Sequence, residues 1–489
     1  MSIRFVTILS ISRIRESTDV RRSVAALAVL CSVSGCFSEQ AIRLQSGDLV
    51  SVPVESDSQS VRQWLVNTHQ RLQPLLPASD RPALLTEDLV DPQGRPIDVF
   101  DTFKEDPASL HQLVGNFHGL LHSAQGIGQV NANHEPPPTW PGFGAVRIGV
   151  DENVTLAGRL GFAVTDGVPH DADCIVILPG LFGDNSILRT RDLADALRQS
   201  GFHVLALELR GHGQTEEDHP DVYYTFGTLE TGDLMAVSEW LEAQPSIRRT
   251  GLFGVCWGAN LGMLAAWYDG RPERHASITD ALNPHVRPVN TRRHFTAGVI
   301  GFSPVLRFEE LIDQLDAEHA YLKNPVLYTF QNTIRARMAL KRHPEVTGSL
   351  RHLIEYEFAR SALRYRGGVA DGSRFLRFLA YDDKPTGDKL DDVRVPVLLI
   401  HGVNDPLAPA QDLADLMAEV DNPNVAGMVL PGGGHVGFAP YARAYYYSLI
   451  LNFFDPVSGA AATCAKRKGT VTAERIFNHA EDEKRSSTQ

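Results

Sequence analysis

Strand-like apolar segments alternate with helical segments from about residue 141 onward, and this alternation most constrains the fold. The strand-like segments are GAVRIGV, LAGRLGFAV, DCIVILPG, FHVLALELRGHG, RTGLFGVCWG, FTAGVIGFSP, RVPVLLIHGVNDP and NVAGMVLPGGGH. Helical spacing is found between them in ILRTRDLADALRQSG, LETGDLMAVSEWLEAQ and AQDLADLMAEV. Strands rich in Val, Ile and Leu that are separated by helices predict an α/β fold with a mostly parallel central sheet flanked by helices. The first two strand-like segments predict a hairpin.

Changes in composition divide the chain into five parts. Residues 1–36 have the layout of a signal peptide, and residues 37–140 form a helical N-terminal segment that ends near the proline run in NHEPPPTWPGFG. Residues 141–456 carry the strands. Within them, residues 305–390 are dominated by helical signals and predict a helical cap over a pocket, since a structureless loop of this length is uncommon. The polar stretch 457–489 predicts a disordered tail.

The N-terminus combines a basic pair with a short apolar run. Arg21 and Arg22 precede the run, which ends at Val33-Ser34-Gly35-Cys36 and is too short to span a bilayer. This tetrapeptide resembles a bacterial lipobox, which implies a lipidated Cys36 and a protein anchored to the membrane surface of a bacterial cell envelope, facing the periplasm. The alternative is a frayed helix or a misassigned start codon, and the protein would then be cytoplasmic.

Net charge and cysteine spacing exclude several classes of function. The formal charge is −13, from 46 basic and 59 acidic residues. Nucleic-acid binding requires a basic face, so we expect neither a nucleic acid nor a nucleotide as a partner. The five cysteines include no C-x-x-C pair, which argues against a zinc ribbon and a thioredoxin motif. We expect no metal and no cofactor.

Three reactive side chains each follow one of the predicted strands. Cys256 ends GLFGVC, Asp405 follows VLLIHGVN, and His435 follows GMVLPGGG. Parallel strands bring their carboxyl ends to one edge of the sheet, where ligands bind. A nucleophile, an acid and a histidine in this order predict a catalytic triad in which Asp405 orients His435, and His435 acts as base and then as acid.

The G-x-C-x-G pattern around Cys256 has a steric reason. A nucleophile on a strained strand-to-helix turn leaves no room for neighbouring side chains, so glycine is expected two residues before and after it. The following helix would direct its dipole at the sulfur and favour a thiolate. The amides of Trp257 and Leu181 are expected to form the oxyanion hole, with Gly180 and Gly183 allowing a close backbone approach.

Each of these residues also has a structural interpretation. Cys256 could be a small buried hydrophobic residue, Asp405 could begin a turn before Pro406, and His435 could lie in a solvated glycine loop. His212, in LRGHGQT, is interpreted as a turn residue after a strand. Cys174 is expected to pack in a strand and Cys464 to lie in the tail.

The chain resembles the α/β-hydrolase superfamily, and within it the YheT-like branch. The matching segments are LPGLFGDN, LELRGHG, YYTFGTLETGDL, GVCWGANLGMLAA, LLIHGVNDPL and GGGHVGF. The resemblance implies ester hydrolysis without a cofactor on a Ser–Asp–His triad, with Cys256 in place of the serine. The sequence departs from the family at this cysteine and at Pro179-Gly180, where the oxyanion loop usually begins His-Gly.

Three functions are compatible with these features. The first is a membrane-anchored hydrolase of carboxylic esters, lactones or thioesters that forms an acyl-enzyme on Cys256, a choice of nucleophile that dienelactone hydrolases resemble. The second is an acyltransferase resembling polyhydroxyalkanoate synthases, which an exported protein would disfavour because their thioester substrates are cytoplasmic. The third is a non-catalytic ligand-binding lipoprotein.

Overall fold

The computed structural model describes residues 60–77, 83–84, 139–272, 293–317, 349–361, 389–456 and 459–461. The predicted signal peptide, including Cys36, lies outside the described residues. So do most of the N-terminal segment 37–140, much of the predicted cap, and most of the tail with Cys464. The description that follows therefore concerns mainly the sheet and the elements packed against it.

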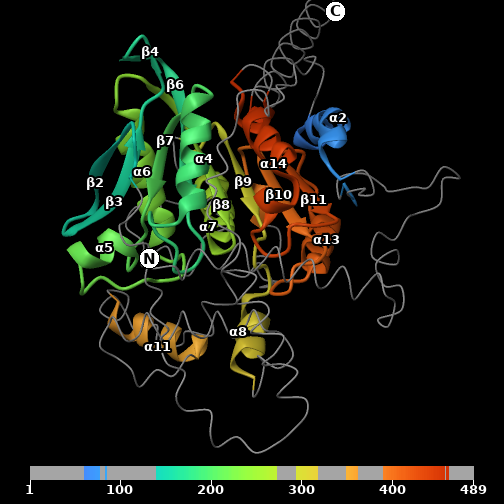
Figure 1. The fold of residues 1–489 in the computed structure, drawn as a ribbon. Helices are drawn as coiled ribbons and strands as arrows, with labels where there is room; N and C mark the ends of the chain where they lie inside the picture. The colour runs from blue at the N-terminus through green and yellow to red at the C-terminus, as the bar shows by residue number, and fades with distance from the viewer. Residues whose placement is uncertain are drawn as a thin grey trace, which may run out of the picture.

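The central element is a sheet of nine strands among the described residues, in the order β1-β11-β10-β9-β8-β6-β7-β3-β2 (Figure 1). Neighbouring strands from β11 to β7 are parallel, whereas β1, β3 and β2 are joined by antiparallel pairing. The predicted hairpin is confirmed as β2 paired with β3. The strands are β1 (Ala83–Leu84), β2 (Phe143–Asp151), β3 (Val154–Gly161), β6 (Ala172–Leu178), β7 (His203–Leu207), β8 (Ile247–Val255), β9 (Gly298–Phe302), β10 (Val397–Gly402) and β11 (Val425–Leu430). A separate small hairpin pairs β4 (Val164–Thr165) with β5 (Val168–Pro169).

Helices cover both faces of the sheet, because the parallel strands alternate their side chains between two cores. On β6, Cys174, Val176 and Leu178 enter the core built with α6 and α7, and Ile175 and Ile177 enter the core built with α4 and α14. Both sets are apolar, which is why the strand reads as a continuous apolar run. The helices that cover the sheet are α4 (Leu188–Gln199), α6 (Glu230–Glu242), α7 (Trp257–Gly270), α13 (Ala410–Glu419) and α14 (Phe438–Phe454). The predicted mostly parallel α/β architecture is confirmed.

One helix of the N-terminal segment packs against β11, near one edge of the sheet. Helix α2 (Val61–Leu72) begins at Ser60, whose hydroxyl accepts the amide of Gln63 as an N-cap. Trp64 of α2 contacts Phe453 of α14, with ring centroids 5.6 Å apart. Arg62 donates hydrogen bonds to the carbonyls of Val420 and Val425 at 2.6 and 3.2 Å. This helix therefore shares the core of the sheet; it is followed by the short turn η1 (Gln73–Leu75).

Two helices lie in the region predicted as a cap. Helix α8 (Phe308–Asp316) starts soon after β9 ends, and α11 (Leu350–Arg360) lies beside it beyond the carboxyl edge of the sheet (Figure 1). Residues 318–348 of the predicted cap, between α8 and α11, lie outside the described residues. The turn η5 (Lys389–Asp392) leads from this region back to β10.

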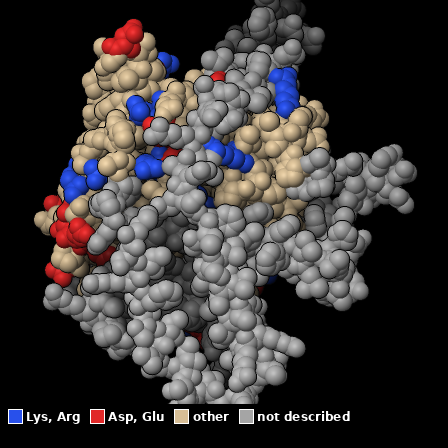
Figure 2. Space-filling view, in the orientation of Figure 1, with Lys and Arg blue, Asp and Glu red and all other residues tan. Residues whose placement is uncertain are grey.

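Charged side chains of both signs are distributed over the visible surface. In Figure 2, acidic side chains gather at the edge formed by α5 (Gly213–Asp218), whose sequence is GQTEED. Within the described residues, no helix combines the length and the hydrophobicity needed to cross a bilayer.

Candidate active site

Cys256 lies on a one-residue turn between a strand and a helix. β8 ends at Val255 and α7 begins at Trp257, and Cys256 between them has φ 53° and ψ −124°. A residue other than glycine seldom adopts a positive φ, and such strain persists where the surrounding structure holds it. Here the Cys256 amide donates a 2.8 Å hydrogen bond to the carbonyl of Phe302 on β9. The turn places the Cys256 side chain at the carboxyl edge of the sheet, in a partly exposed position.

The two glycines that flank Cys256 lie where the backbone leaves no room for a side chain. A Cβ on Gly254 would lie 2.3 Å from the carbonyl oxygen of Gly258. A Cβ on Gly258 would lie 2.5 Å from the carbonyl oxygen of Pro179 and 2.6 Å from that of Leu178. The G-x-C-x-G spacing is thus required by contact between β8, the first turn of α7 and the end of β6.

Asp405 and His435 follow neighbouring strands and meet at the same edge. Asp405 Oδ2 lies 2.8 Å from His435 Nδ1, and both side chains are buried. The other carboxylate oxygen, Oδ1, accepts the amides of Leu407 and Ala408 at 2.8 and 3.0 Å. Burial alone would raise the pKa of Asp405, but His435 and these bonds lower it, so Asp405 is held as a carboxylate.

The environment of His435 favours its protonated form. Burial acts to lower the pKa of His435, yet the neighbouring Asp405 carboxylate and the Cys256 side chain raise it to about 10. Both groups stabilise the imidazolium because they are, or can become, negatively charged beside it. The structure thus brings together Cys256, His435 and Asp405, in that spatial order.

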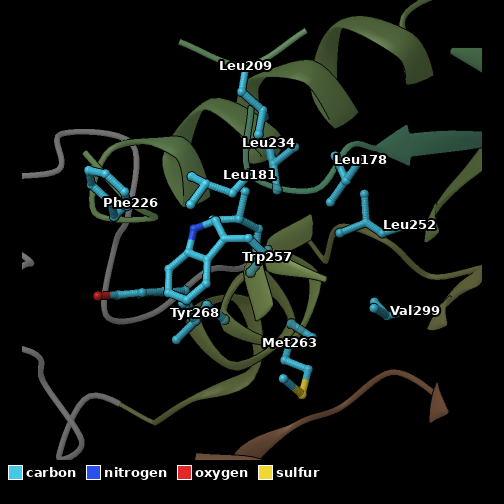
Figure 3. Packing of buried hydrophobic residues seen from close by; sticks show 14 of the residues in the cluster. Leu178, Leu181, Leu209, Phe226, Leu234, Leu252, Trp257, Met263, Tyr268 and Val299 are labelled. Atoms are coloured by element: carbon cyan, nitrogen blue, oxygen red, sulfur yellow. The ribbon is translucent and has the colours of Figure 1, made fainter. Parts of the chain in front are cut away.

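The loop after β6 passes directly beside Cys256. A Cβ on Gly180 would lie 3.2 Å from Cβ and 3.8 Å from Sγ of Cys256. The Gly183 amide donates to the Gly180 carbonyl at 2.9 Å, which closes a tight turn around Leu181. Leu181 and Trp257, the two residues expected to form the oxyanion hole, lie beside each other in the core (Figure 3).

His212, predicted from sequence to be a turn residue after a strand, also supports this loop. Its side chain is buried, and Nε2 accepts the Phe182 amide at 3.1 Å. Nδ1 lies 2.7 Å from the Arg210 carbonyl, to which it must donate, so the ring is neutral with its proton on Nδ1. Phe182 has φ 68°, so this bond holds a strained residue next to Leu181. The sequence signal for this role is the position of His212 shortly after β7, a strand whose carboxyl end lies at the same edge of the sheet as Cys256.

Glu208, which directly follows β7, supports the same loop. Its carboxylate accepts the Asn185 amide at 3.0 Å and the Gln214 amide at 2.7 Å. Glu208 is buried, and burial raises its pKa although these two bonds act to lower it. The segment after β7 therefore fixes the segment after β6 through two side chains, Glu208 and His212.

We predict that His212→Phe lowers kcat by about tenfold or more, since loss of one oxyanion donor costs about 100-fold or more. Phenylalanine preserves a ring against Tyr224, whose centroid lies 4.6 Å from that of His212, but cannot accept the Phe182 amide. KM should change little. His212→Gln, which retains an acceptor, should recover part of the rate, and an equal loss in both variants would contradict the positioning role.

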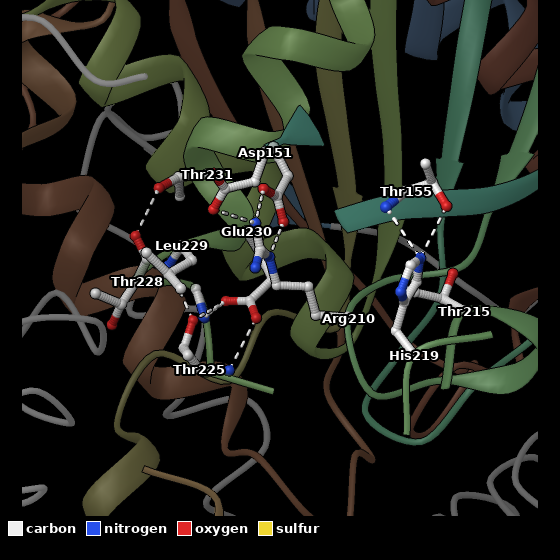
Figure 4. Close-up of polar contacts among 12 residues, drawn as sticks. Asp151, Thr155, Arg210, Thr215, His219, Thr225, Thr228, Leu229, Glu230 and Thr231 are labelled. Carbon is white, nitrogen blue, oxygen red and sulfur yellow. Dashed lines mark hydrogen bonds and ion pairs between the residues drawn. The ribbon is translucent and has the colours of Figure 1, made fainter. Parts of the chain in front are cut away.

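A second group of buried polar residues shapes the segment 224–230 above the site (Figure 4). Arg210 makes a two-point ion pair with Asp233, at 2.5 and 2.7 Å, and both side chains are buried. Glu230 accepts the amides of Thr225 and Gly227, each at 2.8 Å. Because these groups are buried, and Asp151 lies only at 3.8 Å from Arg210, removing Asp233 would leave the Arg210 charge poorly compensated.

The two described helices of the predicted cap pack on this segment through aromatic rings. Phe308 of α8 lies 4.2 Å from Trp257 between ring centroids, and Phe358 of α11 stacks on Phe226 at 5.9 Å. Glu357 of α11 accepts the Tyr224 amide at 3.1 Å. Helix α8 thus contacts Trp257, the residue that follows Cys256, and α11 contacts the segment 224–230.

A cavity of about 90 Å³ lies beside Cys256, on the face of the sheet that α4 and α14 cover. Its walls are mostly apolar and include Leu193, Phe253, Val255 and Ala439, and Cys256 and His435 close its catalytic end. Among the described residues, no group of His, Cys, Asp and Glu side chains is arranged to hold a metal ion. The site is therefore a largely apolar pocket closed at one end by a sulfur and an imidazole, with the Asp405 carboxylate buried behind the imidazole.

A strand, a strained nucleophile turn and a helix, with an acid and a histidine after later strands, define the α/β-hydrolase class. A model of the alpha/beta hydrolase family matches residues 175–445, which is more than half of the chain and includes all three side chains. The chain belongs to this family.

Individual known proteins resemble this chain at low sequence identity. The embryogenesis-associated protein EMB8 of Picea glauca is 22% identical over 307 residues, which cover 59% of this chain and 59% of that protein. An esterase of Pyrococcus furiosus is 17% identical, with 65% and 93% of the two chains covered and a TM-score of 0.39. A dienelactone hydrolase of Anabaena variabilis is 16% identical, with 65% and 98% covered and a TM-score of 0.34.

Proposed function

We propose that the protein hydrolyses carboxylic esters, lactones or thioesters with a Cys256–His435–Asp405 triad. The observation that carries this proposal is the strained turn that presents Cys256 beside the buried His435–Asp405 pair. A buried structural cysteine would need neither the positive φ nor a histidine whose pKa is raised by the sulfur. The proposal keeps the resemblance to the YheT-like branch, with sulfur in place of the serine oxygen.

Catalysis would proceed through an acyl-enzyme. The Cys256 thiolate attacks the carbonyl carbon, and the ester C–O bond breaks as protonated His435 gives its proton to the leaving alkoxide. Neutral His435 then takes a proton from water, which attacks the thioester; the C–S bond breaks and restores the thiolate–imidazolium pair. The net change consumes one ester and one water and yields one acid and one alcohol.

The remaining residues would act on the tetrahedral intermediates. The amides of Leu181 and Trp257 would donate to the oxyanion, as the close approach of the Gly180 backbone to Cys256 supports. The α7 dipole at Trp257 would favour negative charge at the same place. Asp405 would keep the His435 ring in orientation and stabilise its charge.

The test is to capture the acyl-enzyme. A variant lacking residues 1–36 is offered p-nitrophenyl esters, lactones and acyl thioesters, then quenched in acid and examined by peptide mass spectrometry. We expect a hydroxylamine-sensitive acyl group on the peptide containing Cys256, together with a burst of p-nitrophenol. Turnover without acylation of Cys256 would contradict the proposal, and transfer of the acyl group to an added alcohol in preference to water would favour an acyltransferase.

We also propose that Cys36 is lipidated and holds the protein on the periplasmic side of a bacterial membrane. The support is the run of residues from Arg21 to Cys36, whose layout matches a lipoprotein signal. Incorporation of labelled palmitate that disappears in Cys36→Ala is the expected result, and an unlabelled wild-type protein in the cytoplasmic fraction would contradict it.

A further inference from the structure

The cavity beside Cys256 runs along one face of the sheet, from the carboxyl edge toward its middle. Val255 and Phe253 lie two residues apart on β8, so both side chains enter the core built with α4 and α14. Ile177 of β6 is the register partner of Phe253 and enters the same core. All three side chains line the cavity, and at about 3.3 Å per residue Phe253 lies about 7 Å farther from the edge than Val255. The cavity therefore reaches from Cys256 at least to the pair of Ile177 and Phe253.

The wall of the cavity is largely apolar and closely packed. At the inner end, the Phe253 ring lies 5.8 Å from the Phe302 ring between centroids. Leu193 of α4 is buried and forms another part of the wall. Arg189 also lines the cavity, and its Nη1 donates a 2.5 Å hydrogen bond to the carbonyl of Val436. Closely packed side chains yield little space, so this wall limits the length of a group bound there.

A substrate whose carbonyl lies at Cys256 can extend in two directions. One is into the cavity, and the other is toward α8 and α11, none of whose described residues lines the cavity. None of the described residues that do line it is exposed. An alcohol bound in the cavity would therefore have to leave past the acyl group on Cys256. An acyl group, in contrast, stays on the sulfur until water releases it.

We propose that the cavity binds the alkyl part of the acyl group, so that the substrates are esters or thioesters of short aliphatic carboxylic acids. An apolar cavity of about 150 Å³ accommodates benzene, with its six carbons. In proportion, about 90 Å³ accommodates roughly three or four carbons, which corresponds to a butanoyl or pentanoyl group. The assignment rests on the proposed function, because the acyl group must form on Cys256.

The first test varies the acyl chain of p-nitrophenyl esters from acetate through butyrate and valerate to octanoate, after subtraction of their spontaneous rates. In wild type, kcat/KM should rise about fourfold for each methylene up to valerate. It should then fall by about tenfold or more at octanoate, because the added methylenes find no space. A value that keeps rising to octanoate, or that is highest for acetate, would overturn the proposal.

Leu193→Ala tests the length limit by shortening a side chain of the wall. The ratio of kcat/KM for octanoate to that for butyrate should rise by about tenfold or more. The matched control is Leu197→Ala, one turn further along α4, in the same core but outside the cavity lining. Its ratio should equal that of wild type, although both variants lose packing. Equal ratios in the two variants would overturn the proposal.

Butyrate esters of ethanol, butanol and octanol distinguish the acyl side from the alcohol side. Because the alcohol lies outside the cavity, kcat/KM should not fall at octanol as it falls at octanoate. A loss of about tenfold or more along the alcohol series would place the alcohol in the cavity and overturn the assignment.

A further measurement separates this proposal from the proposed function. Alkyl methanethiosulfonates transfer an alkylthio group to a thiolate: the S–S bond to Cys256 forms, and methanesulfinate leaves. Relative to their rates with a free thiol, the propyl reagent should label the Cys256 peptide about tenfold faster than the octyl reagent, and Leu193→Ala should reduce this ratio. If no ester is hydrolysed, the proposed function fails while the labelling still tests the cavity. Equal relative rates in wild type, or no labelling, would overturn the cavity assignment.

Discussion

Cys256→Ala is expected to lower kcat/KM for carboxylic esters by about 1,000-fold or more, because the variant cannot form the acyl-enzyme. Alanine is small enough for the turn between Val255 and Trp257, although its positive φ carries the same strain as in wild type. The residual rate would come from the oxyanion donors and substrate binding alone. Steady-state kinetics on a p-nitrophenyl ester measure the loss. Activity within tenfold of wild type would exclude Cys256 as the nucleophile.

Cys256→Ser separates a sulfur mechanism from an ordinary serine site through the pH profile. In wild type the reactive pair contains protonated His435, whose pKa is raised to about 10. Activity should therefore extend across neutral pH and be lost as pH rises through that value. In the serine variant, His435 must be neutral to act as base, and the contribution of the sulfur to its pKa is absent.

The sign of the effect follows from these protonation states. In the serine variant the pKa of His435 should be lower than in wild type, and activity should rise as pH increases through that pKa. In wild type, activity should fall at alkaline pH. Rates measured from pH 5 to pH 10.5 with a neutral ester test this difference. Two profiles with the same rising limb would show that wild type works like a serine esterase.

Gly254→Ala is expected to destabilise the fold by about 3 kcal/mol or more, in addition to reducing activity. The new Cβ would lie 2.3 Å from the Gly258 carbonyl oxygen and 2.6 Å from the Ala259 nitrogen. Both atoms belong to the backbone of the first turn of α7, so a side-chain rotation cannot relieve the clash. The helix would have to move away from β8, and the Trp257 amide would move with it.

The control for this substitution is Gly149→Ala. Gly149 lies on β2, and a Cβ there would meet no atom within 4 Å. This variant should match wild type in its midpoint of thermal unfolding, or exceed it slightly, because alanine restricts the unfolded chain. Gly254→Ala should unfold at a clearly lower temperature. Similar midpoints for the two variants would contradict the tight packing of β8 on α7.

The sheet and the meeting of Cys256, Asp405 and His435 could be predicted from sequence because both follow from local patterns. Val-rich strands separated by helices imply parallel pairing, and parallel pairing brings the residues after each strand to one edge. Cys256, Asp405 and His435 each lie within about five residues of the end of such a strand, so short loops were enough to bring them together. The glycines around Cys256 were informative because the turn itself forbids side chains.

The residues that support the site could not be predicted in this way. Whether His212 is a turn residue or a hydrogen-bond acceptor for Phe182 depends on the path of two loops in space. Arg189 lies on an amphipathic helix, where an arginine is most often solvated, and its hydrogen bond to the Val436 carbonyl depends on the path of the loop after β11. The docking of α2 depends on contacts with Val420 and Val425, more than 350 residues away along the chain.

The docking of the N-terminal segment has a consequence for handling the protein. Without β1, strand β11 would end the sheet with an open row of amides and carbonyls, a template for pairing with another molecule. β1 pairs with part of β11, and Arg62 of α2 occupies the carbonyl of Val425 at its start. β1 and α2 thus cover part of this edge and should reduce aggregation. A fragment that begins at residue 139 would lose that protection.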